Sequence, residues 1–497
     1  MSMNKTPGTT GLVMEEPLLV ERSHSGRKSC CLPKLDIEAP DLSEFGDLVR
    51  DETEGLPELS EVDLVRHYFR LSQWNYNVES GVYPLGSCTM KHNPKVNEKV
   101  CRFAGFTATH PYDPEALVQG NLELLYRLEE ALKAVSGFEA ITLQPAAGAH
   151  GELTAAMMIR AYHVAQGKPR HKVLIPDSAH GTNPATSALA GFSVVEIKTG
   201  PEGFLTAEAV ADVMDEDTAA VMLTNPNTLG IYEQHIAEIA KIVHDKGGLL
   251  YMDGANFNAQ MGYMRPGDID VDAMHFNLHK TFSTPHGGGG PGSGPVGVGK
   301  RLVAHLPTPR VVKEGETYRL NYDIPESIGP MRSFYGNFGV NVRALAYMLE
   351  LGHDGLKAAT EMAVLNANYI RARLQDHYKL PYATDTLHEC VFSDALQKEH
   401  GISNVDISKR LIDFGFHPPT MSFPLIVHGA LMIEPTETES KEELDAFCDA
   451  FVTMAKEAKE NPEIMHSAPH NSFRRRLDET TAARKPVLTW KMLQEDK

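Results

Sequence analysis

The chain has 497 residues, with 66 acidic and 47 basic side chains, a formal net charge of −19 and 42% hydrophobic residues. This length exceeds what one small core needs and predicts roughly two to four structural units. The negative charge disfavours contact with phosphate backbones and anionic lipid, so we expect no nucleic-acid partner and no membrane partner.

The chain also lacks targeting and metal signals. No stretch approaches the roughly 18 apolar residues of a spanning helix, and Glu15 and Glu16 interrupt an opening that has no signal-peptide pattern. The six cysteines show neither C-x-x-C pairs nor zinc-finger spacing. We therefore expect a cytoplasmic protein without a structural metal.

The first part of the chain is predicted to be an arm and then a helix. Residues 1–60 are rich in proline, glycine and charge and lack hydrophobic periodicity, which predicts an extended arm. From about 115 to 136 apolar residues recur at helical spacing, and Gly137 follows as a helix stop.

A strand and helix alternation follows. Short apolar runs predict strands at 141–143, 172–176, 194–197, 219–225 and 249–253. Apolar residues at i, i+3, i+4 and i+7 predict a helix before Gly247: Ile236, Ile239, Ala240 and Val243. This alternation predicts an α/β domain over residues 61–335 with a mostly parallel sheet, in which ligands bind beyond the strands' C-terminal ends.

The pattern changes after about residue 335. A long helical stretch is followed by mixed short strands and helices. We predict a smaller α+β domain over residues 336–465 and a polar tail over residues 466–497.

A glycine-rich run matches two nucleotide-binding motifs in letters only. Gly292, Gly294 and Gly297 fit G-x-G-x-x-G, but glycines precede the pattern where a dinucleotide site needs a strand. Gly294 to Lys300 fit G-x-x-x-x-G-K, but Arg301 follows in place of the Ser or Thr that binds Mg²⁺. Neither nucleotide site is predicted.

Another set of residues fits a pyridoxal-phosphate site, which needs a lysine amine, an acid for the pyridine nitrogen, a stacking group and a phosphate cradle. Asp253 ends a predicted strand and is the predicted pyridinium partner. Lys280 is the predicted Schiff-base lysine, because burial and a neighbouring cation would favour its nucleophilic amine. His279 is predicted to supply that cation or to reach the phosphate.

Small residues form the predicted phosphate cradle. Ala147, Gly148 and Ala149 lie at a strand-to-helix turn, where bare backbone amides attract a phosphate dianion. The neighbouring His150 has an alternative interpretation as a hydrogen-bonded loop histidine.

Later turns supply the predicted ring contacts. His180 would stack on the ring while Ala255 covers the other face, and Asn225 and Thr228 would bond to the phenolic oxygen. Each residue alone has an ordinary interpretation as a cap, a solvated side chain or a loop histidine. Their combination and order along the chain predict the cofactor.

Five segments resemble the P-protein of the glycine cleavage system, in the C-terminal half that many bacteria make as a separate subunit. They are YPLGSCTMKHNPK (83–95), TLQPAAGAHGE (142–152), HFNLHKTFSTPHGGGGPG (275–292), FHPPTMSFPLIVHGALMIEPTETES (416–440) and RKPVLTW (484–490). The likeness spans nearly the whole chain. It implies fold type I, the aspartate-aminotransferase type, with a large pyridoxal-phosphate domain, a smaller C-terminal α+β domain and an N-terminal arm.

The resemblance also implies an oxidoreductase that decarboxylates glycine, releases CO₂ and transfers the aminomethyl group to the lipoyl cofactor of the H-protein. Lys280 carries over as its Schiff-base lysine. A homologous subunit corresponding to the N-terminal half is implied as partner, in a heterotetramer of two plus two chains. Candidates for binding the substrate carboxylate, with structural roles equally open, are His92, Asn93, His286 and Arg332.

Two alternatives stay open. Another fold-type-I enzyme, such as an aminotransferase or an amino-acid decarboxylase, would share Asp253 and Lys280. A non-catalytic scaffold subunit would keep the fold without the chemistry, but the presence of Lys280 argues against it.

Overall fold

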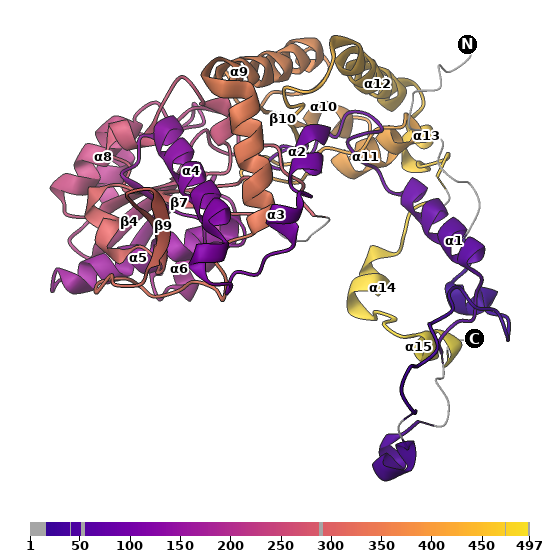
Figure 1. Cartoon of the computed structure of the whole chain (residues 1–497). Helices are drawn as coiled ribbons and strands as arrows, with labels where there is room; N and C mark the ends of the chain where they lie inside the picture. Colours follow the sequence, from indigo (N-terminus) through magenta and orange to yellow (C-terminus); the bar gives the residue numbers. More distant parts are fainter. Residues whose placement is uncertain (1–15, 40, 51–54, 288–291, 473, 496–497) are drawn as a thin grey trace.

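The computed structural model describes residues 16–39, 41–50, 55–287, 292–472 and 474–495. Figure 1 shows a large body built on one sheet, a smaller helical part beside it, and an arm and a tail that extend away from both. In the described ranges, no helix combines the length and the apolar character needed to cross a membrane.

The large body contains a seven-stranded sheet in the order β1-β7-β6-β5-β4-β2-β3. Its strands are β1 Ala140–Thr142, β2 Lys172–Pro176, β3 Ser193–Ile197, β4 Thr218–Thr224, β5 Leu249–Gly254, β6 Ala273–Phe276 and β7 Val296–Val298. The pairs from β3 through β2, β4 and β5 to β6 are parallel, and β7 runs antiparallel to β6 and β1. The prediction of a mostly parallel sheet is confirmed, and all five predicted strands form within about one residue of their expected ends.

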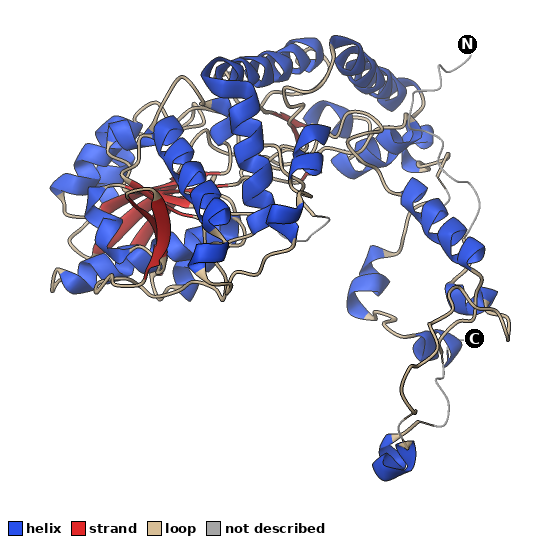
Figure 2. Cartoon of the chain, viewed as in Figure 1, coloured by secondary structure: helices blue, strands red, loops and turns tan. Residues whose placement is uncertain are grey.

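Helices cover both faces of this sheet (Figure 2). They are α4 Gln119–Ser136, α5 Gly148–Ala165, α6 Thr182–Leu189, α7 Ala207–Val213 and α8 Ile236–Asp245, with the 3-10 helices η4 Phe257–Ala259, η5 Pro266–Ile269 and η6 Lys300–His305. Along β4, Val221 and Leu223 face the core with α4, α7 and α8, while Ala220 and Met222 face the core with α5. This alternation follows from the two-residue period of a strand and explains why the buried strands have continuous apolar sequences.

The rejected nucleotide motifs lie in an unsuitable element. Gly297 is inside β7, which is antiparallel to its neighbours and leads into a 3-10 helix rather than an α-helix. Residues 288–291 lie outside the described ranges. The hairpin β8 Arg310–Glu314 and β9 Thr317–Asn321 follows η6 and was not predicted.

The smaller part has its own core around a three-stranded sheet of β10 Cys390–Ser393, β12 Ala430–Ile433 and β11 Thr420–Met421, in that order. Its helices are α10 Ala395–Lys398, α11 Asn404–Asp413, α12 Lys441–Glu460 and α13 Pro462–His466. The long helix α9, Phe338–Leu374, breaks at Gly352 (φ 60°) and supplies residues to the core of each part. The domain limits at 335 and 465 stay a prediction.

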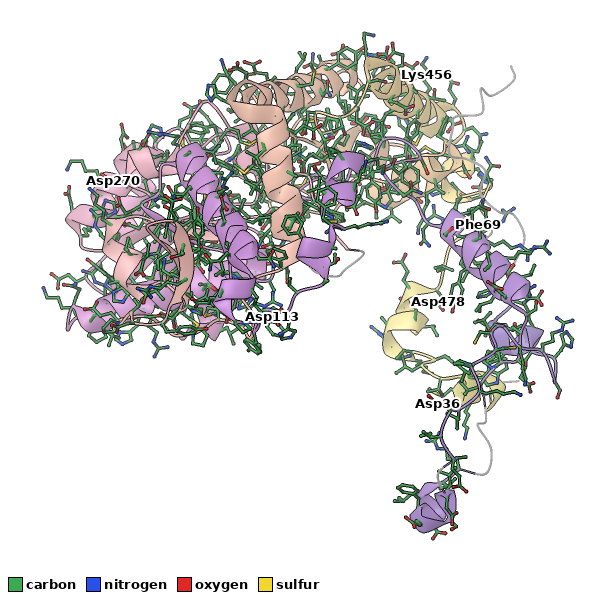
Figure 3. The ribbon with its side chains drawn as sticks, viewed as in Figure 1. Asp36, Phe69, Asp113, Asp270, Lys456 and Asp478 are labelled. Carbon is green, nitrogen blue, oxygen red and sulfur yellow. The ribbon has the colours of Figure 1, made fainter. Side chains whose placement is uncertain are left out.

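The arm and the tail lie together beside the body. The arm contains η1 Leu19–Arg22 and η2 Leu42–Leu48 and leads into α1 Glu61–Trp74; α2 Lys95–Val100, α3 Ala104–Thr107 and η3 Glu115–Leu117 then reach the body. The tail contains α14 Glu479–Arg484 and α15 Trp490–Glu495. Figure 3 labels Asp36 on the arm and Asp478 on the tail.

Candidate active site

A cavity of about 190 Å³ opens at the C-terminal edge of the sheet. Its walls come from the last residues of β4, β5 and β6, from the segments that follow β1, β2, β4, β5 and β6, and from Ser87. The C-terminal ends of parallel strands are where ligand-binding residues are expected to meet. Eight of the ten predicted site residues line it: Gly148, Ala149, His180, Thr228, Asp253, Ala255, His279 and Lys280. Ala147 is the N-cap of α5 and Asn225 lies outside the lining.

Lys280 contributes an amine to this cavity. The Lys280 N–H donates to the Asn277 carbonyl (3.0 Å), and its own carbonyl accepts from Ser283 N–H (3.3 Å), which fixes the backbone. The amine itself forms no hydrogen bond or ion pair with any residue that the structure describes. An amine held by its backbone and free at its tip can react with a carbonyl group.

Asp253 is the buried carboxylate of the site. Its Oδ1 accepts from Ala255 N–H (2.9 Å) and lies 3.5 Å from His275 Nε2, while Oδ2 accepts from Asn183 Nδ2 (3.2 Å). Burial alone would raise the pKa of Asp253, but His275, the Ala255 amide, the Lys280 charge and Asn183 together lower it. Asp253 is therefore an anion at neutral pH.

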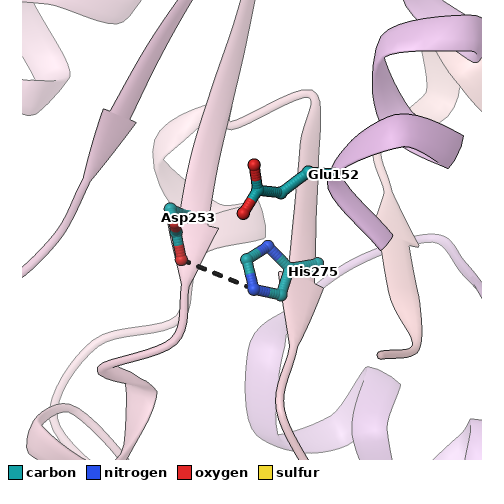
Figure 4. A group of neighbouring side chains, drawn as sticks. All are labelled: Glu152, Asp253 and His275. Carbon is teal, nitrogen blue, oxygen red and sulfur yellow. Dashed lines mark ion pairs between the residues drawn. The ribbon is translucent and has the colours of Figure 1, made fainter. Parts of the chain in front are cut away.

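A second carboxyl group, Glu152, lies beside Asp253 and His275 (Figure 4). Its Oε2 accepts from Asn183 Nδ2 (2.9 Å), the same amide nitrogen that contacts Asp253. Burial, followed by the negative charge of Asp253, raises the pKa of Glu152 to about 8. The pair thus carries one negative charge at neutral pH, and that charge belongs to Asp253.

His275 completes the cluster from the neighbouring strand. It stands opposite Asp253 in the β5–β6 register, and its Nδ1 is 2.5 Å from the Tyr251 hydroxyl. The sequence interpretation missed both Glu152 and His275. For Glu152 a signal was available, because it lies one helical turn after Gly148 and therefore on the same face of the helix. For His275 no signal was available, because the sequence interpretation had not identified its strand.

The predicted phosphate cradle lies at the first turn of α5. No side chain caps this end of the helix, so its first amides remain available to an anion. Gly294 packs against it so closely that a Cβ atom there would lie 2.0 Å from the Ala147 carbonyl oxygen. His150 Nδ1 accepts from Ala146 N–H (3.1 Å), so the ring is hydrogen-bonded as in its alternative interpretation, but the residue lies in the first turn of α5 and not in a loop.

His279 and His286 pack edge to face, with ring centroids 5.0 Å apart. Burial, then the charge of its neighbour His286, lowers the pKa of His279 to about 3, and burial, then Lys280, lowers that of His286 to about 4. Both rings are neutral at pH 7. Of the two roles predicted for His279, contact with the phosphate fits this state and the supply of a cation does not.

Of the predicted ring contacts, His180 and Thr228 line the cavity and Asn225 does not. His180 lies on the cavity wall, its Nδ1 accepts from Thr182 N–H (3.2 Å), and burial lowers its pKa. Thr228 also lies on the wall but donates its hydroxyl to the Ser178 carbonyl (2.5 Å). Asn225 Oδ1 accepts from Glu233 N–H (3.0 Å), away from the cavity lining.

Three polar atoms of the cavity lining are buried without a hydrogen-bond partner among the described residues. They are Thr224 Oγ1, Asn256 Oδ1 and Asn277 Oδ1. Buried polar atoms without partners are costly, so a ligand with polar groups at this position would satisfy them.

None of the four candidates for the substrate carboxylate lines the cavity. Arg332 Nη1 donates to Asn337 Oδ1 (2.7 Å), Asn93 Nδ2 donates to Ser283 Oγ (3.3 Å), and His92 lies 3.6 Å from Glu79 near the surface. Protein groups contact these three side chains, which fits a structural role, whereas His286 packs against His279 and its Nε2 is buried without a hydrogen-bond partner among the described residues.

The sequence matches the family described as "Glycine dehydrogenase, C-terminal domain" over residues 359–475 and the class-V aminotransferases over residues 149–289. It is 55% identical over 476 residues to a probable glycine dehydrogenase (decarboxylating) subunit 2 of Caldanaerobacter subterraneus subsp. tengcongensis, covering 95% of this chain and 98% of that protein. A protein with the same name from Listeria monocytogenes serotype 4a is 56% identical over 477 residues, with the same coverage. The chain belongs to the glycine dehydrogenase (decarboxylating) subunit 2 family.

Solved structures confirm the fold. A glycine decarboxylase (P-protein) of the glycine cleavage system, in inhibitor-bound form, superposes with a TM-score of 0.69 at 18% identity, covering 83% of this chain and 94% of that one. A NifS-like protein superposes with a TM-score of 0.58 at 17% identity, covering 76% and 99%. The predicted family and fold type I are both confirmed, and family membership makes the chain a glycine-decarboxylating oxidoreductase that depends on pyridoxal phosphate.

Proposed function

We propose that this chain decarboxylates glycine in the cavity around Lys280, with Lys280 as the Schiff-base lysine and Asp253 as the partner of the pyridine nitrogen. The observation that carries this proposal is the presence of a free amine and a buried anionic carboxylate on the walls of one cavity. When bound, pyridoxal phosphate supplies the electron sink that makes loss of the glycine carboxylate feasible.

The residues around the cavity fit this cofactor. The uncapped first turn of α5, at Gly148 and Ala149, would hold the phosphate. His180 and Ala255 would cover the two ring faces, and the unpartnered hydroxyl of Thr224 offers a hydrogen bond. Thr228 and His279, which line the cavity, are further proposed contacts, and so is Asn225 from outside the lining.

The protein's own groups control the charge next to the ring nitrogen. Asp253 would keep a proton on that nitrogen when the cofactor is bound, because its carboxylate is anionic and lines the cavity. Asn183 and His275 hold the carboxylate in place. Glu152 stays protonated at neutral pH, so a second negative charge does not compete with Asp253.

The proposal also includes two protein partners. We infer that the aminomethyl group passes to the lipoyl arm of the H-protein, and that a homologous subunit corresponding to the N-terminal half of the P-protein joins this chain in a heterotetramer of two plus two. The name "subunit 2" of the relatives supports a partner subunit. A cytoplasmic location is part of the proposal, and the acidic charge of −19 disfavours nucleic-acid partners.

The test is reduction of the purified protein with borohydride, followed by peptide mapping. We expect one pyridoxyl group, attached to Lys280, and glycine-dependent exchange of CO₂ in the presence of lipoylated H-protein and the partner subunit. Absence of the adduct with cofactor and partner both present would refute the role of Lys280. Production of a keto acid instead of CO₂ would favour an aminotransferase.

A further inference from the structure

A short segment of the chain, Ser87–Asn93, is held by carboxylates of the smaller part. Glu434 accepts hydrogen bonds from the Thr89 amide (3.0 Å) and the Thr89 hydroxyl (2.5 Å), and Glu389 accepts one from the Ser87 amide (2.9 Å). Both glutamates are fully buried. The segment therefore follows the position of the smaller part, although Ser87 itself lines the cofactor cavity.

Lys91, in the same segment, forms a buried contact with the residue after Lys280. Its Nζ donates to the Thr281 carbonyl (2.9 Å), to Glu437 Oε1 (2.7 Å) and to the Tyr347 hydroxyl (3.3 Å). These three contacts use all three N–H groups of the ammonium. Burial alone would lower the pKa of Lys91, but the Glu437 carboxylate outweighs it and raises the pKa, so the ammonium stays charged.

The backbone on both sides of this contact is strained. Ser87 (φ 62°) and Thr89 (φ 48°) adopt the left-handed conformation, and so does Ser283 (φ 54°) in the loop after Lys280. Ser283 Oγ donates to the His92 carbonyl (2.9 Å), which joins the two strained stretches directly. Non-glycine residues keep such conformations only where the surrounding structure enforces them, and they concentrate at functional sites.

Stability alone gives little reason for a charged pair here. Replacing a buried ion pair with apolar residues is commonly neutral or stabilising, whereas removing one partner is costly. Only a group with several donors can bind the Thr281 carbonyl, Tyr347 on α9 and Glu437 at the same time. The distinctive property of Lys91 is thus that it links the loop of Lys280 to the smaller part.

We propose that Lys91 is a positioning residue that fixes the peptide after Lys280 and so sets how the Lys280 amine enters the cavity, with Glu437 as its charge partner. This inference rests on the proposed function of Lys280. It also makes the geometry at Lys280 depend on the placement of Glu437 in the smaller part.

The test compares Lys91→Met, Glu437→Gln and the double variant with a matched control, Arg410→Met. Arg410 forms an equally buried ion pair, with Asp413 (3.0 Å) and Glu457 (2.8 Å), but within the smaller part. For each holoenzyme we would measure thermal unfolding, the pH midpoint of the cofactor's absorption change, and the rate at which the cofactor dissociates.

We expect Lys91→Met to shift the absorption midpoint by about one pH unit or more and to speed cofactor loss about tenfold. Glu437→Gln should act in the same direction with a smaller effect, and it keeps the test available if Lys91→Met does not fold. Arg410→Met should lower thermal stability and leave both cofactor measurements unchanged. In the double variant, stability should recover because no buried charge is left unpaired, while the midpoint stays shifted.

Two results would overturn the inference. One is a Lys91→Met protein that loses stability as Arg410→Met does and keeps the wild-type midpoint and dissociation rate. The other is a double variant in which stability and midpoint both return to wild type, since Lys91 would then be structural only. If the wild-type protein itself carries no pyridoxyl group on Lys280 after reduction, the proposed function fails, and this outcome is separate from both.

Discussion

Asp253 Oδ1 lies 3.5 Å from His275 Nε2, and the two residues stand opposite each other on the parallel strands β5 and β6. The strand register thus places an imidazole beside the carboxylate that faces the cavity. Because the Tyr251 hydroxyl bonds the other ring nitrogen of His275, the imidazole is oriented from both sides. After burial, which would raise the pKa of Asp253, His275 is the largest of the contacts that lower it.

Replacement of Lys280 with alanine should abolish covalent cofactor attachment and glycine-dependent CO₂ exchange and leave the fold intact. The side chain lines a cavity and forms no hydrogen bond or ion pair with a described residue, so its removal breaks none of these contacts. Absorption spectra, exchange assays and thermal unfolding test this expectation. Lys241→Ala, at an exposed ion pair with Asp245, is the matched control and should behave as wild type; wild-type exchange by Lys280→Ala would contradict the assignment.

Asp253→Asn should retain the cofactor weakly and lose decarboxylation by at least about a hundredfold, the usual effect of losing one preorganised electrostatic group. The amide keeps the size of the side chain and removes the anion next to the ring nitrogen. Steady-state CO₂ release and cofactor titration measure the two effects. Asp245→Asn removes an exposed carboxylate as a control, and an Asp253→Asn protein with the wild-type rate would remove Asp253 from its role.

Glu152 should make the folded protein less stable as the pH rises from about 4.5 to about 8. Its pKa is raised to about 8 in the folded protein, so in this window the folded state holds a proton that the unfolded state has lost. Each pH unit in the window then costs up to about 1.4 kcal/mol of unfolding free energy. The loss begins above the unfolded pKa and is complete once the pH passes the folded one.

Glu152→Gln should therefore lose less stability than wild type between pH 5 and pH 8, as measured by urea unfolding. Glu129 is a suitable comparison, because burial raises its pKa to about 8 far from the cavity lining. Glu129→Gln should flatten the stability profile in the same way without changing the cofactor spectrum, whereas Glu152→Gln should change both. Equal pH slopes in wild type and Glu152→Gln would show that Glu152 is ionised throughout.

Gly294→Ala should weaken cofactor binding. The new Cβ atom would lie 2.0 Å from the Ala147 carbonyl oxygen, so the first turn of α5 must move, at a cost of about 1–3 kcal/mol. Gly299→Ala is the control in the same region, because its nearest contact would be at 3.5 Å. Equal cofactor affinities for the two variants would mean that this turn does not hold the phosphate.

The sequence alone determined the α/β fold class, five of the seven strands of the large sheet and the placement of Asp253 at the end of one of them, but not β6 or β7. These features depend on local information: apolar runs, helical spacing and the residues directly after each strand. The segment around Lys280 also indicated the family, because it combines a lysine with neighbouring histidines and glycines in one stretch of chain.

Only the tertiary structure decided which further side chains share the site. Glu152 and His275 lie 123 positions apart (275 − 152), and Lys91 and Glu437 lie 346 apart. Such contacts depend on strand register, on the direction of each side chain and on the packing of the smaller part, none of which local periodicity records. The same reason explains why Asn225 Oδ1 accepts from the Glu233 amide and Arg332 donates to Asn337, outside the cavity lining where the sequence interpretation expected contacts with ligands.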